Sequence, residues 1–421
     1  MKQLKIKTNL NKSEKYILTC SFGPDSMALF RYLLDNDFDF EVAHVNYHIL
    51  AQSDSDCKKI VDFCGVFHKK VHILSTHMPS GVNEEEWARD VRYDYFDYLA
   101  KKTGITKILV AHNKSDLVET YIMQKQKGTH LYYGISENLT RKKSIIVRPL
   151  LNYTKDELLE FVLATNTPYS IDPSNTNPAF YRNKIRLDLR SLKPEEIEEL
   201  FEKCMADNAK NERILAKYNP YFDEVYGFNF QEALKSGLKE DELHVLLIKY
   251  FKDKGIVAEI SEGRAHEIYL KASAINRPSI DRINSRFNLY YEYGYLKIDE
   301  PHCKYECELN SMLSNDCFEI NKDKLDEFMK TQNSRILIKN AVSAAFFEKN
   351  GQKTSINRLL SKMKVPLSIR DIWPGLFNEN GELIYVPRFR KDSKKEGIIS
   401  PNLTNLEKLT LVNCQKDIIE L

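Results

Sequence analysis

The sequence predicts an α/β protein. Its N-terminal part is expected to be a parallel sheet with helices on both faces, followed by a helical domain and a small β-rich C-terminal domain. Three observations lead to this fold class. Short apolar runs alternate with segments of helical spacing through the first half of the chain. Polar clusters follow the apolar runs, which is where parallel strands present ligands. The 421 residues suffice for about three domains.

Four apolar runs in the first half have the length of buried strands, and a segment with helical spacing follows each of them. Strands that alternate with helices form βαβ units, and such units build a parallel sheet that is covered on both faces. The expected strands are residues 16–20, 40–45, 71–74 and 107–111, and the expected helices are residues 26–34, 54–64, 84–102 and 115–125.

The charge changes in blocks, and these blocks suggest the domain boundaries. Residues 124–193 hold twelve Lys or Arg against six Asp or Glu, whereas residues 194–247 hold thirteen acids against six bases and have helical spacing. Short β-type runs recur further on. They lie at residues 335–339, 382–386 and 409–412. We therefore expect a sheet domain at 1–193, a mainly helical domain at 194–299 and a small mixed or β-rich domain at 300–421.

Composition excludes several classes of protein. The net charge of +2 excludes a globally basic nucleic-acid binder, although a locally basic surface is allowed. Eight cysteines without a Cys-x-x-Cys pair favour a reducing cytoplasm, and His302 with Cys303, Cys307 and Cys317 is poorly spaced for zinc. Residues 1–15 lack the apolar core of a signal peptide, and no apolar run reaches about 18 residues, so neither secretion nor a membrane span is expected.

The loop after the first expected strand is a candidate anion site. A strand–loop–helix turn directs backbone N–H groups and a helix N-terminus at one point, which suits phosphate. A plain turn in which Ser or Asp caps the helix is the alternative. A carboxylate beside phosphate fits only if it works through a cation, so Asp25 is the candidate metal residue. The loop residues are Ser21, Phe22, Gly23, Pro24, Asp25 and Ser26.

A second cluster follows the expected strand at 107–111. His112, Asp116 and Glu119 are spaced four and three apart, so they share one face of a helix. Paired carboxylates suit an ammonium group, and His112 can take up a proton near neutral pH. The alternatives are a first-turn acid favoured by the helix dipole for Asp116, and a strand-end residue bonded to backbone for His112.

Basic residues form two further candidate sites. Arg89 and Arg92 are three apart on one expected helix, so they share a helix face and form a candidate cationic site, although a Glu85–Arg89 surface ion pair is the alternative. A mixture of basic and aromatic residues is typical of RNA binding, because phosphates take the charges and bases stack on rings. A solvated helix face is the alternative. The candidate RNA-binding residues are Lys127, Arg148, Tyr181, Arg182, Lys184 and Arg186.

Several segments carry a resemblance to a known family. The loop at 21–26 resembles the Ser-Gly-Gly-x-Asp-Ser pyrophosphate loop (PP-loop) of the N-type ATP pyrophosphatases, with Phe22 in place of the first glycine. The order and spacing of the other segments resemble the tRNA(Ile)-lysidine synthases, with Gln124 and Lys127 where that family favours Arg. Those segments are residues 43–48 (AHVNYH), 81–93 (GVNEEEWARDVRY), 111–120 (AHNKSDLVET), 148–151 (RPLL), 172–175 (DPSN) and 181–186 (YRNKIR).

The resemblance implies an adenine-nucleotide α-hydrolase-like fold and a ligase that uses ATP and Mg²⁺. In this reaction ATP adenylates the carbon-2 oxygen of the wobble cytidine of tRNA(Ile) with a CAU anticodon. The amine of free L-lysine then displaces AMP to give lysidine. The resemblance places His44 and Asn46 beside the adenine, and it leaves open which of Asp116 and Glu119 meets lysine and which meets metal. The resemblance also leaves open whether the protein forms a homodimer.

Two alternatives remain at this stage: another PP-loop tRNA-modifying enzyme such as a thiolase, and a catalytically inactive tRNA-binding protein. The second is motivated by Phe22. Under the family interpretation, residues 1–193 form the ATP-binding catalytic domain and residues 300–421 bind tRNA. The third domain carries its own candidate basic patch, consisting of Lys339, Lys353, Arg358, Lys362 and Lys364.

Overall fold

The structure is a computed structural model. The chain forms two compact units, Met1–Asn211 and Glu212–Leu421, and each is described by itself. The described residues are 6–49, 52–171, 185, 188–189, 191–224, 226–274, 278–301, 306–308, 318–331, 335–340, 346–349, 352–362, 365–370, 372–386 and 399–401.

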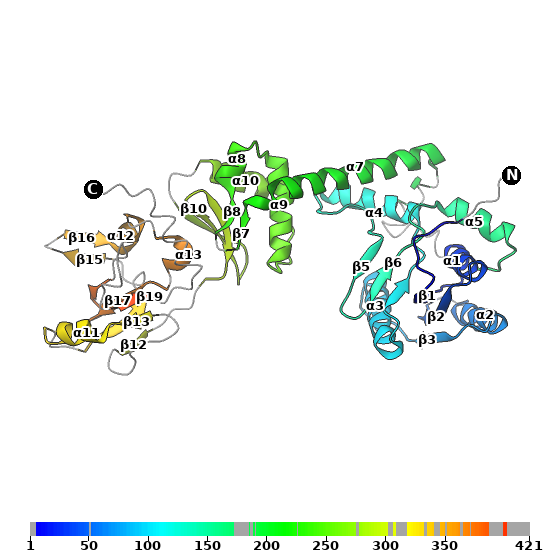
Figure 1. The fold of residues 1–421 in the computed structure, drawn as a ribbon, viewed down its shortest axis with the longest axis horizontal. Helices are drawn as coiled ribbons and strands as arrows, with labels where there is room; N and C mark the ends of the chain where they lie inside the picture. The colour runs from blue at the N-terminus through cyan, green and yellow to red at the C-terminus, as the bar shows by residue number, and fades with distance from the viewer. Residues whose placement is uncertain are drawn as a thin grey trace. The chain divides into compact units, whose positions relative to one another are not determined.

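A six-stranded sheet in the order β3-β2-β1-β4-β6-β5 organises the first unit (Figure 1). Every neighbouring pair from β3 to β6 is parallel, and only the edge strand β5 runs antiparallel to its neighbour. The predicted parallel sheet is therefore confirmed, with an antiparallel edge that was not expected. The strands are β1 (Lys15–Thr19), β2 (Asp39–Asn46), β3 (Val71–Ser75), β4 (Lys107–Leu109), β5 (Asn138–Thr140) and β6 (Ile145–Val147).

Helices cover both faces of this sheet, because alternate residues of its strands point to opposite sides. Tyr16 and Leu18 of β1 pack into the core on the side of α1, α2 and α5, whereas Ile17 packs into a second core with α3. Figure 1 shows α1, α2 and α5 together on one side of the sheet. The helices are α1 (Pro24–Asp35), α2 (Ser53–Val66), α3 (Glu84–Thr103) and α5 (Lys155–Ala164).

Two further helices, α4 (Lys114–Lys127) and α7 (Pro194–Tyr218), extend the first unit. Leu117 and Val118 of α4 share a buried cluster with Cys204 of α7. Helix α7 runs across residue 211, where the two units divide. The expected division at 193/194 and 299/300 stays a prediction.

Residues just after the sheet strands start two of these helices with a capping box, in which the N-cap side chain and the third helical residue exchange hydrogen bonds with each other's backbone. Asn113 and Asp116 form the box of α4, and Thr154 and Glu157 form that of α5. Both helix starts are thereby fixed near the C-terminal edge of the sheet, where ligands are expected.

The second unit begins with helices around a five-stranded antiparallel sheet in the order β7-β8-β11-β10-β9. Helices were expected between residues 194 and 299, but this sheet was not. Its strands are short, and aromatic residues obscure the alternation of polar and apolar side chains that would indicate them. The elements are β7 (Phe222–Asp223), β8 (Gly227–Asn229), α8 (Phe230–Lys235), α9 (Glu240–Asp253), α10 (Glu262–Ser273), β9 (Ser279–Arg282), β10 (Asn288–Glu292) and β11 (Tyr295–Asp299), preceded by the short 3₁₀ helix η2 (Asn219–Tyr221).

Small antiparallel sheets follow; the β-rich character was predicted from the β-type runs, but the antiparallel pairing was not. β14 (Leu337–Asn340) and β18 (Leu383–Tyr385) coincide with two of those runs, whereas the run at 409–412 lies outside the described residues. The buried carboxylate of Glu292 in β10 accepts hydrogen bonds from the backbone N–H and hydroxyl of Ser368 in α13. The remaining elements are β12 (Glu306–Glu308), β13 (Phe318–Ile320), α11 (Lys322–Met329), β15 (Phe346–Lys349), β16 (Gln352–Ser355), α12 (Ile356–Lys362), α13 (Leu367–Arg370), β17 (Pro374–Phe377) and β19 (Ile399–Pro401).

Candidate active site

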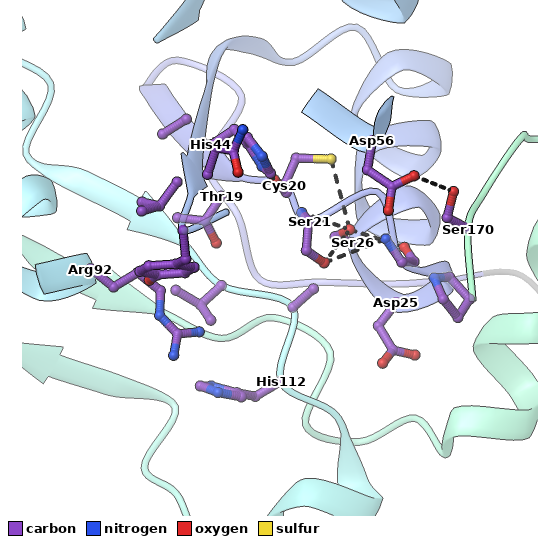
Figure 2. A pocket seen from close by; sticks show the side chains of 18 of the residues that line it. Thr19, Cys20, Ser21, Asp25, Ser26, His44, Asp56, Arg92, His112 and Ser170 are labelled. Carbon is purple, nitrogen blue, oxygen red and sulfur yellow. Dashed lines mark hydrogen bonds between the residues drawn. The ribbon is translucent and has the colours of Figure 1, made fainter. Parts of the chain in front are cut away.

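A cavity of about 630 Å³ opens at the C-terminal edge of the parallel sheet, and we call it the nucleotide cavity (Figure 2). The ends of β1, β2 and β4, the start of α1 and side chains of α2, α3, α4 and α5 contribute to its lining. The loop at 21–26 lies on one side and His112 on the other. Most of the residues predicted as a site from the sequence are therefore brought together here.

Serine hydroxyls hold the loop in its conformation. The Ser26 hydroxyl donates to the Gly23 carbonyl oxygen over 3.0 Å and accepts from the Ser21 N–H over 3.3 Å. Gly23 is the N-cap of α1 and Pro24 is its first residue, where a missing N–H leaves no helical bond unmade. The helix N-terminus thus faces the cavity. It supplies partial positive charge where an anion is expected.

Phe22 stands in for the glycine of the PP-loop pattern and adopts the conformation that favours glycine. Its φ is 62°, in the left-handed region. The ring is only 4% exposed and packs edge-on against Phe63, with the Lys59 ammonium 5.9 Å from the ring centre. Because the ring is buried in the hydrophobic core beside α2 and does not line the cavity, it leaves the phosphate side of the loop open.

Asp25 carries the one carboxylate of the loop at 21–26, and its surroundings favour a bound cation. Its pKa is raised to about 6, chiefly by burial and also by nearby Asp116, whereas Lys155 and the Asn113 side chain lower it. Its Oδ1 is buried without a hydrogen-bond partner. An unpaired buried carboxylate oxygen beside a second carboxylate fits a bound Mg²⁺, which takes one or two carboxylates and completes its shell with phosphate oxygens and water. In the described part of the chain, no three His, Cys, Asp or Glu side chains form a cluster arranged for a metal.

His44 and Asn46, expected beside the adenine, both line the cavity. The His44 Nδ1 lies 2.8 Å from the Cys20 carbonyl oxygen. Since a carbonyl only accepts, Nδ1 carries the proton. Burial lowers the pKa of His44, so the neutral ring presents Nε2 as an acceptor. The Asn46 amide is used within the chain, because it donates to Asp54 over 2.7 Å. An adenine contact by either residue stays a prediction.

The two arginines of α3 lie in different surroundings. Arg92 lines the nucleotide cavity and lies by the hydroxyl of Tyr47, whose pKa burial raises while Arg92 lowers it. Arg89 does not line this cavity, and its guanidinium lies 5.1 Å from the ring centre of Tyr93. The spacing of three correctly placed them on neighbouring positions of one helix, but only Arg92 reaches the site.

Arg148 requires a correction. It was expected on an RNA-binding surface, but it is only 3% exposed. Its Nε donates to the His112 Nδ1 over 3.0 Å, and its other nitrogens donate to the Ser136 carbonyl oxygen and the Tyr93 hydroxyl. The guanidinium is therefore satisfied inside the fold, because it follows the buried strand β6 at the sheet edge.

A second cavity of about 550 Å³ has a strongly acidic lining, and we call it the acidic cavity. Glu119, 2% exposed, lines only this one, whereas Asp116 and Lys155 line both cavities. One oxygen of Asp116 is engaged by the N–H of Asn113 in the capping box. Among the described residues, its carboxyl groups come from Asp116, Glu119, Asp156, Glu157, Glu160 and Glu198, and its ammonium groups from Lys114 and Lys155.

Several residues that line the cavities are not predicted from the sequence. Lys155 belongs to the basic block at 124–193 and has no other signal of its own, although the Thr154–Glu157 capping box that starts its helix is a recognisable pattern. Asp56 and Ser170 line the nucleotide cavity and are hydrogen-bonded to each other over 2.7 Å (Figure 2). No local pattern identifies them, because 114 positions separate them in the chain.

The two departures from the family pattern, Gln124 and Lys127, lie in the last turn of α4 and have different structural settings. Gln124 holds the following loop: its amide oxygen accepts from the Gly134 N–H over 2.6 Å and its amide nitrogen donates to the Tyr132 carbonyl oxygen. Lys127 is exposed at the end of the helix, and its RNA contact stays a prediction. Other predicted positions lie outside the described residues, namely Tyr181, Arg182, Lys184, Arg186, His302, Cys303, Cys317 and Lys364.

The fold and the loop together define a PP-loop protein, a class that uses ATP. Residues 1–193 match the sequence model of the PP-loop domain.

The chain is 37% identical over 217 residues to the tRNA(Ile)-lysidine synthase of Mesoplasma florum, covering 50% of this chain and 54% of that protein. It is 31% identical over 247 residues to the tRNA(Ile)-lysidine synthase of Malacoplasma penetrans, covering 55% of this chain and 82% of that protein. Over 444 residues it is 24% identical to the bifunctional protein TilS/HprT of Listeria innocua, covering 93% of this chain and 68% of that protein. The chain belongs to the tRNA(Ile)-lysidine synthase family, and it spans about half the length of the Mesoplasma florum relative.

Proposed function

We propose that this protein ligates L-lysine to carbon 2 of the wobble cytidine in tRNA(Ile) with a CAU anticodon. ATP first adenylates the carbon-2 oxygen and pyrophosphate leaves; the lysine amine then bonds to carbon 2, and AMP departs with the oxygen. The observation that carries this proposal is the pair of adjoining cavities. One is lined by a phosphate-binding loop and the other by carboxylates, and they share Asp116 and Lys155.

The nucleotide cavity would perform the adenylation. The loop at 21–26 and the N-terminus of α1 would bind the phosphates, and Arg92 would add a positive charge near the α-phosphate. Asp25, with Asp116 beside it, would hold Mg²⁺. The ion would neutralise charge that develops on the leaving pyrophosphate.

The acidic cavity would bind lysine. An ammonium group that leaves water needs compensating negative charge. Glu119 and Asp116 offer that charge, and Asp116 adjoins the nucleotide cavity where the acceptor carbon would be held. Lys155, also shared, would supply a counter-charge for a carboxylate or phosphate group.

The tRNA would reach the cavities with its anticodon loop, whose bases are already largely unstacked. Lys127 and the basic residues at 181–186 would meet phosphates near the site, and residues 300–421 would add a second contact through the third-domain patch. A cytoplasmic location follows from these substrates. No helix in the described part of the chain has both the length and the apolar character needed to cross a bilayer. The homodimer stays a prediction.

The thiolase alternative finds no support in the cysteines. Cys20 is the one cysteine, among the described residues, that lines either cavity. Burial raises its pKa to about 11, which keeps the thiol protonated and unreactive at neutral pH.

The direct test is incubation with tRNA(Ile) of CAU anticodon, ATP, Mg²⁺ and labelled lysine, followed by nucleoside analysis. Lysidine should form with release of AMP and pyrophosphate. The matched control is the same transcript with uridine at the wobble position, which should incorporate no lysine. Binding of the tRNA without any ATP-dependent lysine incorporation would contradict the proposal and leave the inactive tRNA-binding protein as the explanation.

A further inference from the structure

Lys114 places a buried ammonium group in the strongly acidic cavity. It is the first residue of α4, lines the acidic cavity and is 9% exposed. Its Nζ lies 2.6 Å from Oε2 of Glu198 on α7 and 4.7 Å from the ring centre of Phe201. Glu198 lines the same cavity, and its side chain is 49% exposed. The lining therefore holds one positive and one negative group side by side, with the negative group nearer to solvent.

The position of this ion pair within the cavity follows from the lining residues. Asp116 and Lys155 line both cavities and so lie at the junction, whereas Lys114 and Glu198 line only the acidic cavity. A lysine bound for the reaction must place its reacting amine at the junction, where the acceptor carbon would be held. The rest of the molecule then extends away from the junction. Ile197, which also lines only the acidic cavity, offers apolar surface to the methylene groups.

The other end of a lysine molecule carries opposite charges close together, a carboxylate and an α-ammonium group. A carboxylate that enters a lining rich in carboxyl groups needs a compensating cation. Of the two ammonium groups in the described lining, Lys155 lies at the junction and Lys114 beyond it. Lys114 and Glu198 offer the complementary pair of charges. An ammonium group has three N–H donors and a carboxylate about four acceptor positions, so the two side chains can bind such a group while they stay paired.

We propose that Lys114 and Glu198 are specificity-determining residues that recognise the α-amino-acid group of lysine. Lys114 binds the carboxylate and Glu198 binds the α-amine, so the side-chain amine meets Asp116 and Glu119. This inference rests on the proposed function, in which the acidic cavity binds lysine, and it assigns the end of the substrate that does not react. The pair thereby selects an amino acid over a plain diamine or a plain amino carboxylate.

The first test compares lysine with two analogues in the wild-type protein. Cadaverine lacks only the carboxylate, and 6-aminohexanoate lacks only the α-amine. Each should be attached to tRNA(Ile) with a kcat/KM at least about thirtyfold below that of lysine, mostly through a higher KM. Mass spectrometry of the nucleosides identifies each product. Equal use of lysine and either analogue would overturn the proposal, whether or not any variant folds.

The second test separates recognition from a purely structural role, in which the ion pair would only join α4 to α7. Lys114→Met should prefer lysine over cadaverine by no more than about threefold, and Glu198→Gln should lose the preference over 6-aminohexanoate to the same extent. Pyrophosphate release without lysine should persist in both, because neither residue lines the nucleotide cavity. A variant that kept the wild-type preference between lysine and its analogue would overturn the assignment of that residue.

The matched control is a second ion pair between the same two helices. Lys125 on α4 lies 3.3 Å from a carboxylate oxygen of Asp207 on α7, and its Nζ is 5.0 Å from the ring centre of Tyr133. Neither Lys125 nor Asp207 lines either cavity. Lys125→Met should therefore keep the wild-type preference for lysine over both analogues. Loss of the preference in this variant would show that any weakened contact of α4 with α7 suffices, and it would overturn the proposal.

A binding measurement keeps this inference separate from the proposed function. If the wild-type protein formed no lysidine, the proposed function would fail. Calorimetric titration of the full-length protein with lysine, cadaverine and 6-aminohexanoate would still decide the recognition site. Tighter binding of lysine than of either analogue, lost in Lys114→Met, would support the inference, and equal binding of the three compounds would overturn it.

Discussion

The two cavities of the first unit adjoin each other, yet their linings differ in kind. The nucleotide cavity mixes a phosphate loop with acidic, basic and histidine side chains. The acidic cavity has six carboxyl groups against two ammonium groups among its described lining residues. An anion and a cation can thus be bound side by side. Asp116 and Lys155, which line both, are the residues through which one cavity can influence the other.

The largest effect should come from Asp25, which lines only the nucleotide cavity. Asp25→Asn removes the charge that would hold Mg²⁺, so pyrophosphate release and lysidine formation should both fall by at least about a thousandfold, roughly 4 kcal/mol. Pyrophosphate release is measured with tRNA and without lysine. The matched control is Asp35→Asn on the same helix, which removes an exposed pair with Arg31 and should have little effect. Near-normal release by the Asp25 variant would separate this carboxylate from the metal.

Substitutions at Glu119 and Asp116 should affect the two half-reactions, adenylation and lysine transfer, differently. Each amide variant should lose at least about a hundredfold in lysidine formation, roughly 2.7 kcal/mol. Glu119→Gln affects the acidic cavity alone, so adenylated tRNA should accumulate. Asp116→Asn affects both cavities and should slow adenylation too, while the amide can still accept the capping bond.

The reactions are run at low lysine concentration, and nucleoside analysis distinguishes the two products, lysidine and the adenylated tRNA. Glu195→Gln, on the exposed start of α7 and outside both cavities, serves as the control. If both variants formed lysidine at the normal rate, the acidic cavity would not be the lysine site, and helix capping would be the remaining role of Asp116.

Lower pH should weaken the binding of ATP–Mg²⁺ in the nucleotide cavity. The pKa of Asp25 is raised to about 6, so the carboxyl group is protonated below this pH and charged above it. Protons then compete with Mg²⁺, and the apparent affinity for ATP–Mg²⁺ should fall by up to about tenfold per pH unit below 6. Titration calorimetry between pH 5 and 8 measures this effect. ATP binding in EDTA should depend less on pH, and an equal dependence with and without the metal would exclude Asp25 as its ligand.

The smallest effect on binding is expected at Phe22. Its ring points into the core, so Phe22→Gly should change the affinity for ATP by less than about tenfold, roughly 1.4 kcal/mol. Stability should change more. Loss of the buried ring costs about 3–5 kcal/mol, and relief of the left-handed conformation returns about 1. A lower thermal midpoint with nearly unchanged calorimetric affinity is the expected combination. Activity that appears only in the glycine variant would instead show that Phe22 disables the loop.

Much of the nucleotide cavity could be predicted from the sequence, because its residues follow strands in short local patterns. The runs at 16–20 and 107–111 located β1 and β4, and the residues after them, His112 and the loop at 21–26 apart from Phe22, do line the cavity. The acidic cavity could not be predicted in the same way. Glu119 belongs to a local motif, but Glu157 and Glu198 come from α5 and α7. Nothing local in those helices indicates that they meet.

The sequence by itself determined the order of strands and helices, the phosphate loop and the family, because periodicity and motif spacing are properties of neighbouring residues. Only the tertiary structure decided which side chains reach the site. A spacing of three put Arg89 and Arg92 on one helix, but packing against the sheet left only Arg92 in the cavity. The mixture of basic and aromatic residues suggested an RNA contact for Arg148, whereas its position after β6 placed the guanidinium among Tyr93, Ser136 and His112. Burial and long-range hydrogen bonds made these choices, and both depend on residues far apart in the chain.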